Sequence, residues 1–411
     1  MKKLLLIILF LIVVSLIGGS LIGCKGATTS ITTTALLKQV TVVIGTDSPL
    51  TGPASPWGLG VMHGVQLAVD DFNAAGGITI DDTQYTFKVI SLDDQYDAAT
   101  STNNVRTLVN SDGAQYIVDF DTDSSVALAS ELSREKVINF TVCVDDRVLD
   151  QAANSYTFRT CNSYSEVIPS FTAWIAKTYP NVKTMSIMSV NNLNGNVATE
   201  DSVAAAEAVN ITVNSSVSYD SGTMDFTPFV AKILASNPDM LMITGCPAGD
   251  TALIIKTARD SGYKGLMATQ PNQAAADMLS IAGSANLEGV VNDNLALLPP
   301  LISPTALGMA AREVAKWGTS YGDTWDFYGQ TTLMLTAMKR AQSLDTTAVK
   351  NILQDPTQIW PYVAFTQGTA TFDSAAAKSL YGANAINQIS APYAISVIHN
   401  GNDTVAAVVN P

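Results

Sequence analysis

Short β-branched segments alternate with segments of helical apolar spacing along most of this 411-residue chain. Residues 40–46 are rich in Val, Ile and Thr, which predicts a strand. A Pro/Gly-rich loop is expected at 48–60. From 61 to 72 the apolar positions follow the spacing of a helix with one buried face, and Gly76-Gly77 predicts its end.

The alternation continues as far as residue 261. Strands are predicted at 85–92, 115–120, 137–142, 184–190, 211–219 and 240–244, and helices at 98–109, 126–135, 165–178, 197–208, 226–236 and 251–261. Strands that alternate with helices in this way predict parallel sheets covered on both faces. Because the series restarts after residues 156–159, we predict an α/β fold with two doubly wound, Rossmann-like lobes. The pattern is mostly helical after 290, and strands are expected near 391–399 and 404–409.

Ligands bind open α/β sheets at the carboxyl ends of the strands. With two such lobes, the expected ligand site is the cleft between them.

Residues 1–23 have the order of a secretory signal peptide, with two lysines, an apolar run too short to span a membrane, and then small residues. Residues 21–24 resemble the bacterial lipobox, which implies a lipid on Cys24 and attachment to a membrane. The alternative is a buried structural cysteine. Residues 24–38 are rich in Thr and Ser, which predicts a flexible linker. We therefore expect an exported protein, lipid-anchored at a periplasmic or extracellular membrane face.

Composition narrows the functional classes. The net charge of −14 argues against nucleic-acid binding. The chain has two histidines and no CxxC motif, so we expect no metal site and no cofactor. In an oxidising compartment Cys143 and Cys161 could form a disulfide and leave Cys246 free; three buried free thiols are the alternative, and both interpretations stand.

Several short motifs occur in one order between Val40 and the C-terminus. They are Ser-Pro-Leu-Thr-Gly-Pro at 48–53, the segment 64–78 that contains Asn-Ala-Ala-Gly-Gly, Asp-Asp-Gln at 93–95, Phe-Arg-Thr at 158–160, Asp-Phe-Thr at 225–227, Asn-Pro-Asp at 237–239 and Glu-Gly-Val at 288–290. Together they resemble the type I periplasmic binding proteins, in particular the leucine/isoleucine/valine-binding branch that serves ABC importers.

This resemblance implies two lobes joined by three hinge strands, with crossings near Thr160, Val290 and Phe372. Lobe 1 is then 39–160 plus 291–372, and lobe 2 is 161–290 plus 373–411. Binding of a small-molecule ligand closes the hinge, and the closed form is presented to an ABC permease in the membrane. The resemblance also implies a monomer and no covalent chemistry.

The resemblance assigns ligand contacts to the loops at the strand ends. These residues are Trp57, Asp123, Ser124, Val144, Asp145, Asn194, Pro247, Gln270 and Trp325. For Trp57 and Trp325 the alternative is packing within a lobe, and packing is the favoured interpretation of Trp325.

Two of these positions depart from an amino-acid site. An ionised Asp123 has no donor for a ligand carboxylate, and Gln270 has no charge for an α-ammonium group. One hypothesis is that Asp121, Asp123 or Asp145 receives a cationic or donor-rich group, and that the ligand is not a standard branched-chain amino acid. In the alternative, these aspartates are solvated or cap the helix that starts near Ser125.

Two further patterns suggest other chemistry. Asp119, Asp121 and Asp123 match the first half of a calcium loop, but Ser124 and Ser130 stand where that loop needs Gly and Glu.

Residues 318–322 fit the G-x-S-x-G nucleophile elbow around Ser320, but the preceding residues have a helical pattern and the motif needs a strand there. A serine hydrolase therefore remains a remote alternative. We expect a non-enzymatic solute-binding lipoprotein that delivers an amino acid or related small polar metabolite to an ABC importer. The alternative is a ligand-binding sensor that docks on a membrane receptor.

Overall fold

The computed structural model describes residues 37–150, 152–271, 273–294, 302–362, 369–372, 378, 387–389 and 392–409. The predicted signal peptide, Cys24 and all of the predicted linker before Leu37 lie outside these residues. Among the described helices, none is long and apolar enough to cross a membrane.

The first sheet has the strand order β2-β3-β1-β4-β5-β6. All neighbouring strands are parallel except β2 and β3. The strands are β1 (Lys38–Ser48), β2 (Ile78–Ile80), β3 (Thr83–Asp93), β4 (Tyr116–Asp119), β5 (Ile138–Thr141) and β6 (Thr157–Arg159).

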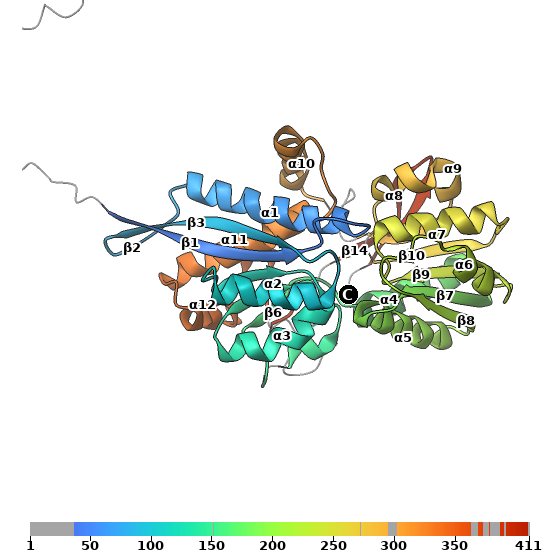
Figure 1. Cartoon of the computed structure of the whole chain (residues 1–411), viewed down its shortest axis with the longest axis horizontal. Helices are drawn as coiled ribbons and strands as arrows, with labels where there is room; N and C mark the ends of the chain where they lie inside the picture. Colours follow the sequence, from blue (N-terminus) through green and yellow to red (C-terminus); the bar gives the residue numbers. More distant parts are fainter. Residues whose placement is uncertain are drawn as a thin grey trace, which may run out of the picture. The chain divides into compact units, whose positions relative to one another are not determined.

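Helices cover both faces of this sheet, as the alternation of strands and helices predicts. Helices α1 (Ser55–Ala74), α10 (Pro304–Trp317), α11 (Thr324–Ala341) and α12 (Thr346–Leu353) contribute to a core on one face. Helices α2 (Ala98–Asn110) and α3 (Thr122–Arg134) pack in a separate core that includes Val105 and Leu128. This sheet and its helices form lobe 1 (Figure 1).

The second sheet has the order β15-β14-β11-β10-β9-β7-β8, with β14 and β15 antiparallel to their neighbours. Its strands are β7 (Thr184–Val190), β8 (Thr212–Tyr219), β9 (Met240–Thr244), β10 (Leu266–Gln270), β11 (Val291–Asn294), β14 (Tyr393–His399) and β15 (Asn402–Val409). Its helices are α4 (Tyr164–Thr178), α5 (Leu193–Ala208), α6 (Thr227–Leu234), α7 (Ala248–Asp260), α8 (Ala275–Ala282) and α9 (Ser284–Leu287). They form lobe 2 (Figure 1), and the two mixed parallel sheets confirm the predicted two-lobed α/β fold.

The chain passes between the lobes at positions that differ in part from those expected. It leaves lobe 1 after β6, near the predicted Thr160. The strand β11 pairs with β10 and β14 in the second sheet, although residues 291–372 were expected in lobe 1. Gln388 forms a parallel bridge with Arg159, and Ile389 packs in the lobe 1 core, although residues 373–411 were expected in lobe 2. These expected crossings came from the family resemblance, and the pattern of a segment as short as 291–294 does not indicate which sheet it joins.

The strand predictions at 184–190 and 240–244 match β7 and β9 residue for residue. The predicted loop 48–60 is too long, because α1 already begins at Ser55, with Pro56 in its first turn, where a missing N–H costs nothing. The helical pattern expected before residues 318–322 is confirmed, which argues against a nucleophile elbow there. Gly318 is the left-handed cap that ends α10, so Ser320 follows a helix and not a strand.

Candidate functional site

A cavity lies where the carboxyl ends of strands from both sheets meet. Lobe 1 supplies residues from α1, α11 and the loops after β3, β4 and β5. The lining residues are Trp57, Tyr96, Phe120, Thr122, Val142, Val144, Cys161, Asn162, Tyr164, Val167, Asn194, Pro271, Asp293, Asp323, Asp326 and Phe327. The position agrees with the cleft predicted from the topology of open α/β sheets.

Aromatic rings form much of the cavity wall in lobe 1. The ring centroid of Trp57 lies 6.1 Å from Tyr96 and 5.8 Å from Phe120, and Phe120 lies 6.1 Å from Phe327. Trp57 follows closely on the start of α1, where Gly58 approaches Pro49 so closely that a Cβ atom would lie 2.0 Å from the Pro49 carbonyl oxygen. This close approach holds the first turn of α1, and with it Trp57, against the loop after β1.

Asn194 provides a polar contact between the two lobes. Its side-chain Nδ2 donates to the phenol oxygen of Tyr96 at 3.0 Å and to the Gly245 carbonyl oxygen at 3.0 Å. Asn194 sits in the first turn of α5, which Asn192 caps by accepting from the Gly195 backbone N–H at 2.9 Å. The helix cap therefore sets the position of the amide that reaches across to lobe 1.

Three carboxyl groups also line the cavity. Asp293 lies at the end of β11 and is buried, and Asp323 and Asp326 lie at the start of α11. Asp326 accepts hydrogen bonds from the Tyr362 hydroxyl at 2.5 Å and from Gln330 Nε2 at 2.7 Å. Burial raises the pKa of Asp326 to about 6, although these two hydrogen bonds act in the opposite direction.

Comparison with known proteins identifies the fold family. Residues 41–390 match the family described as Periplasmic binding protein. The chain belongs to this family. It is 28% identical over 237 residues to Leu/Ile/Val-binding protein homolog 8 of Brucella abortus, a match that spans 55% of this chain and 56% of that relative.

Solved structures share the fold. A leucine binding protein from Thermotoga maritima has a TM-score of 0.75 at 19% identity, covering 90% of this chain and 99% of the other. A solute binding protein of an ABC transporter from Rhodopseudomonas palustris, in complex with 4-hydroxybenzoate, has a TM-score of 0.72 at 18% identity, covering 90% and 97%. The family consists of binding proteins, which confirms the prediction that this periplasmic binding protein is not an enzyme.

Of the residues that the resemblance assigned to the ligand, three line the cavity. These are Trp57, Val144 and Asn194. Trp57 is also 4% exposed and packs on its aromatic neighbours. It therefore both lines the cavity and packs within lobe 1. Gln270 and Trp325 lie beside the lining residues Pro271 and Asp326 in the sequence, but both are buried outside the lining, and Trp325 belongs to the lobe 1 core.

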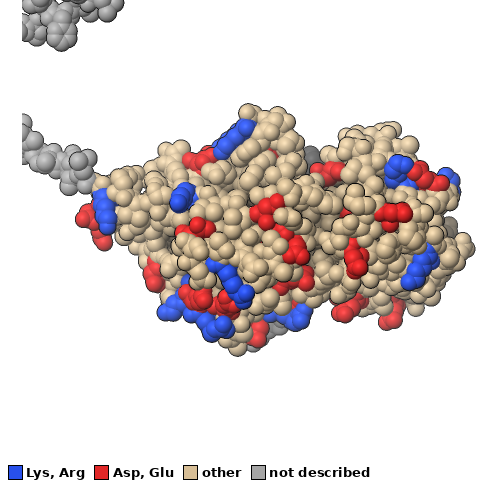
Figure 2. Space-filling view, in the orientation of Figure 1, with Lys and Arg blue, Asp and Glu red and all other residues tan. Residues whose placement is uncertain are grey.

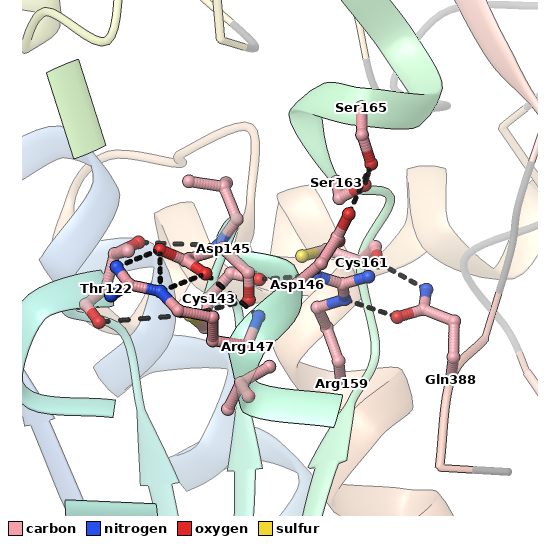
Figure 3. Close-up of polar contacts among 12 residues, drawn as sticks. Thr122, Cys143, Asp145, Asp146, Arg147, Arg159, Cys161, Ser163, Ser165 and Gln388 are labelled. Carbon is pink, nitrogen blue, oxygen red and sulfur yellow. Dashed lines mark hydrogen bonds and ion pairs between the residues drawn. The ribbon is translucent and has the colours of Figure 1, made fainter. Parts of the chain in front are cut away.

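The predicted loop aspartates outside the lining act mainly as helix caps. Asp121 caps α3 by accepting from the Ser124 N–H at 2.7 Å, and Ser124 itself is buried behind the cavity wall. Asp145 caps the short 3-10 helix Asp146–Leu149 and accepts from Arg147 (Figure 3). Pro247 occupies the cap position of α7 outside the lining. Asp121 therefore caps the helix named in the alternative, whereas Asp145 caps a different, shorter helix.

Asp123 makes a contact between the lobes. Its Oδ1 accepts from the backbone N–H of Leu193 at 3.3 Å, at the start of α5. Asp119 accepts from Ser125 Oγ at 2.7 Å and from the Asp121 backbone N–H at 3.3 Å. In the part of the chain that the structure describes, no group of three His, Cys, Asp or Glu side chains is placed to hold a metal ion.

The two cysteines near the first crossing do not form a disulfide. Cys143, Cys161 and Cys246 are free and buried, as in the second interpretation of the sequence. The Cys143 Sγ faces the carbonyl oxygens of Thr122 and Asp145, at 3.8 and 3.6 Å. The side chain of Arg159 lies between Asp146 and Gln388 (Figure 3).

Sequence reasoning missed most of the cavity wall. Tyr96 directly follows the Asp-Asp-Gln motif at 93–95, and Phe120 and Thr122 alternate with Asp119, Asp121 and Asp123. The sequence analysis assigned functions to those aspartates and not to the three lining residues. Asp293 lies near the end of β11, a strand that was not predicted, and its position at a strand end becomes visible only with that strand in place.

Proposed function

We propose that this protein is the solute-binding component of an ABC importer and captures an amino acid or a related small polar metabolite. The observation that carries this proposal is a cavity lined from both lobes, across which Asn194 donates to Tyr96. A solute in the cavity contacts both lobes at once, so its binding favours their closed arrangement. The Rhodopseudomonas palustris relative is named as a solute binding protein of an ABC transporter, which agrees with this role.

The proposal includes export, a lipid on Cys24 and a linker of about 15 residues before the lobes. It also includes the division into two lobes that move about the crossing strands. A tether to the membrane keeps the binding protein within reach of its permease. No covalent step is needed, since the cleft only has to bind, close and release.

The direct test is a thermal-shift screen of the purified protein against amino acids, amides and amines, followed by calorimetry on every hit. We expect one chemical class to bind with one site per chain, and Trp57→Ala to abolish that binding. Trp174→Ala is the matched control, because Trp174 packs in the lobe 2 core away from the cavity. A protein that binds none of these solutes, in a cell whose uptake is unchanged by deletion of the gene, would contradict the proposal.

A further inference from the structure

The charges that line the cavity all have one sign. Asp293 comes from lobe 2, Asp323 and Asp326 come from lobe 1, and none of the described residues that line the cavity is Lys, Arg or His. We propose that the cavity selects organic cations, meaning solutes with an ammonium group on an apolar body and no free carboxylate. This inference rests on the proposed function and names the ligand class of the same cavity.

The arginines on the segments around the cavity are neutralised by neighbouring aspartates. Arg159 is fully buried, and its Nη1 lies 2.9 Å from Asp146 Oδ1. Arg147 donates through Nε to both carboxylate oxygens of Asp145 at 3.0 Å (Figure 3). A ligand carboxylate would have to compete with these pairs for a guanidinium group.

Two of the helix N-termini beside the cavity, those of α3 and α5, are occupied by the protein's own aspartates. An exposed helix N-terminus is a favourable place for an anion. At α3, whose first residue Thr122 lines the cavity, the Asp121 carboxylate accepts from the Ser124 N–H at 2.7 Å. At α5, Asp123 accepts from the Leu193 N–H at 3.3 Å. The protein's own carboxylates therefore hold these two positions, and the N-terminus of α4 at Tyr164 is a third that has no side-chain cap.

The amide of Asn194 is not available to a ligand carboxylate. Both of its hydrogens are used, one by Tyr96 and one by Gly245. A ligand carboxylate in this cavity would lose its water and lie among three carboxyl groups, and a hydroxyl such as that of Tyr164 offers it only a single neutral donor. An ammonium group gains the three carboxyl groups instead.

The aromatic wall suits the apolar body and the charge of such a cation. The faces of Trp, Tyr and Phe attract a cation within about 6 Å of the ring centre. Trp57, Phe120 and Phe327 form a contiguous series of rings, and Tyr164 adds a hydroxyl that is buried without a hydrogen bond to the described residues. A bound ammonium group can donate to that hydroxyl oxygen.

A second cavity adjoins the first at Val144 and is also mainly acidic. Its described lining contains Asp145, Asp146, Glu200 and Asp201, with Arg147 as the one cation among these described residues. Burial, together with the neighbouring carboxylates, raises the pKa of Asp201 to about 6. Figure 2 shows acidic side chains on the drawn face of both lobes near their junction. A field of this sign raises the local concentration of cations and lowers that of anions.

The test compares solutes of one shape and different charge by calorimetry at about pH 7 and low salt, where the α-amino group of leucinamide is mostly protonated. The aliphatic cation probes are leucinamide and isopentylamine. Leucine is the matching zwitterion and 4-methylpentanoate the matching anion. Tyramine, a cation, and 4-hydroxybenzoate, an anion, form an aromatic pair. We expect at least one amine to bind about tenfold more tightly than its carboxylate counterpart. Tighter binding of leucine, 4-methylpentanoate or 4-hydroxybenzoate overturns the cation proposal but supports the proposed function. Binding of no probe and of no solute in the wider screen overturns both.

Substitutions identify the carboxyl groups that produce the selectivity for amines. Asp323→Asn and Asp293→Asn each should weaken amine binding about tenfold or more, without weakening binding of the uncharged analogue isovaleramide to a similar extent. Asp260→Asn is the matched control, because it removes one negative charge from the exposed surface of α7. Equal effects of Asp260→Asn and Asp323→Asn on amine binding would overturn the proposal. An unchanged melting temperature shows that each variant remains folded.

Discussion

The side-chain amide of Asn194 donates to the phenol oxygen of Tyr96 at 3.0 Å and thereby connects α5 of lobe 2 to the loop after β3 in lobe 1. Both residues also line the cavity. The backbone N–H of the preceding residue, Leu193, donates to Asp123 of α3. The start of α5 is thus held to lobe 1 by two hydrogen bonds beside the proposed ligand.

Tyr96→Phe keeps the aromatic ring in the cavity wall and removes the hydrogen bond to Asn194. The Asn194 amide retains Gly245 as a partner, so the loss falls mainly on the closed arrangement of the lobes. We expect ligand affinity to fall about fivefold, the worth of roughly one hydrogen bond, in a calorimetric titration. Tyr85→Phe, on β3 outside the cavity, is the control; an equal loss in both variants would argue against a role for the contact between the lobes.

Binding of a cation should depend on pH through Asp326. Burial raises the pKa of this carboxyl to about 6, so it is largely ionised at pH 8 and largely protonated at pH 5. A bound ammonium group favours the ionised form, so affinity should fall as the pH drops through 6. Affinity for an amine that stays constant between pH 8 and pH 5 would contradict this prediction.

A buried cluster of carboxyl groups behind the cavity should make the protein less stable at high pH. Burial raises the pKa of Asp94 to about 8, and burial together with Asp119 and Asp94 raises the pKa of Asp47 to about 9. In the unfolded chain these groups ionise near pH 4. Unfolding therefore releases protons in this window, and the free energy of unfolding falls as the pH rises from about 4 toward the folded-state values.

Asp94→Asn should reverse part of this loss. Asp94 Oδ1 accepts from the Tyr96 N–H at 2.6 Å, which an amide oxygen can replace, and Oδ2 has no hydrogen-bond partner among the described residues. We expect the variant to be more stable than the wild type at pH 9, by an amount on the order of 2 kcal/mol in denaturant melts, and the gain to vanish near pH 4. Asp81→Asn, in the exposed turn before β3, is the control. A gain of the same size at both pH values would show that ionisation is not its cause.

The three described cysteines should be unreactive in the folded protein. Burial raises the pKa of Cys161 and of Cys246 to about 12, and it raises the pKa of Cys143 well above its usual range. Alkylating reagents attack the thiolate, which is therefore scarce at neutral pH. Mass spectrometry should find these cysteines unmodified in the native protein and all three alkylated after denaturation without a reductant. Labelling that requires a reductant would instead demonstrate a disulfide.

The local pattern of the sequence was sufficient for the fold but only in part for the site. The apolar spacing predicted α1 and the β-branched runs predicted β7 and β9, because local preference and burial agree there. Asp121 and Asp123 were correctly noticed as unusual, yet sequence cannot distinguish a ligand contact from a helix cap, and it cannot pair Asp123 with Leu193, 70 residues later. Asp293 and Asp323 meet only through the tertiary fold.

The most direct test of the account is a crystal structure of the protein with its bound solute. We predict ligand density in the cavity between Trp57 of lobe 1 and Tyr164 of lobe 2, with the ligand's polar group beside Asp293 and Asp323. A solute bound outside this cavity, for example in the adjoining one beside Glu200 and Asp201, would contradict the assignment of the site.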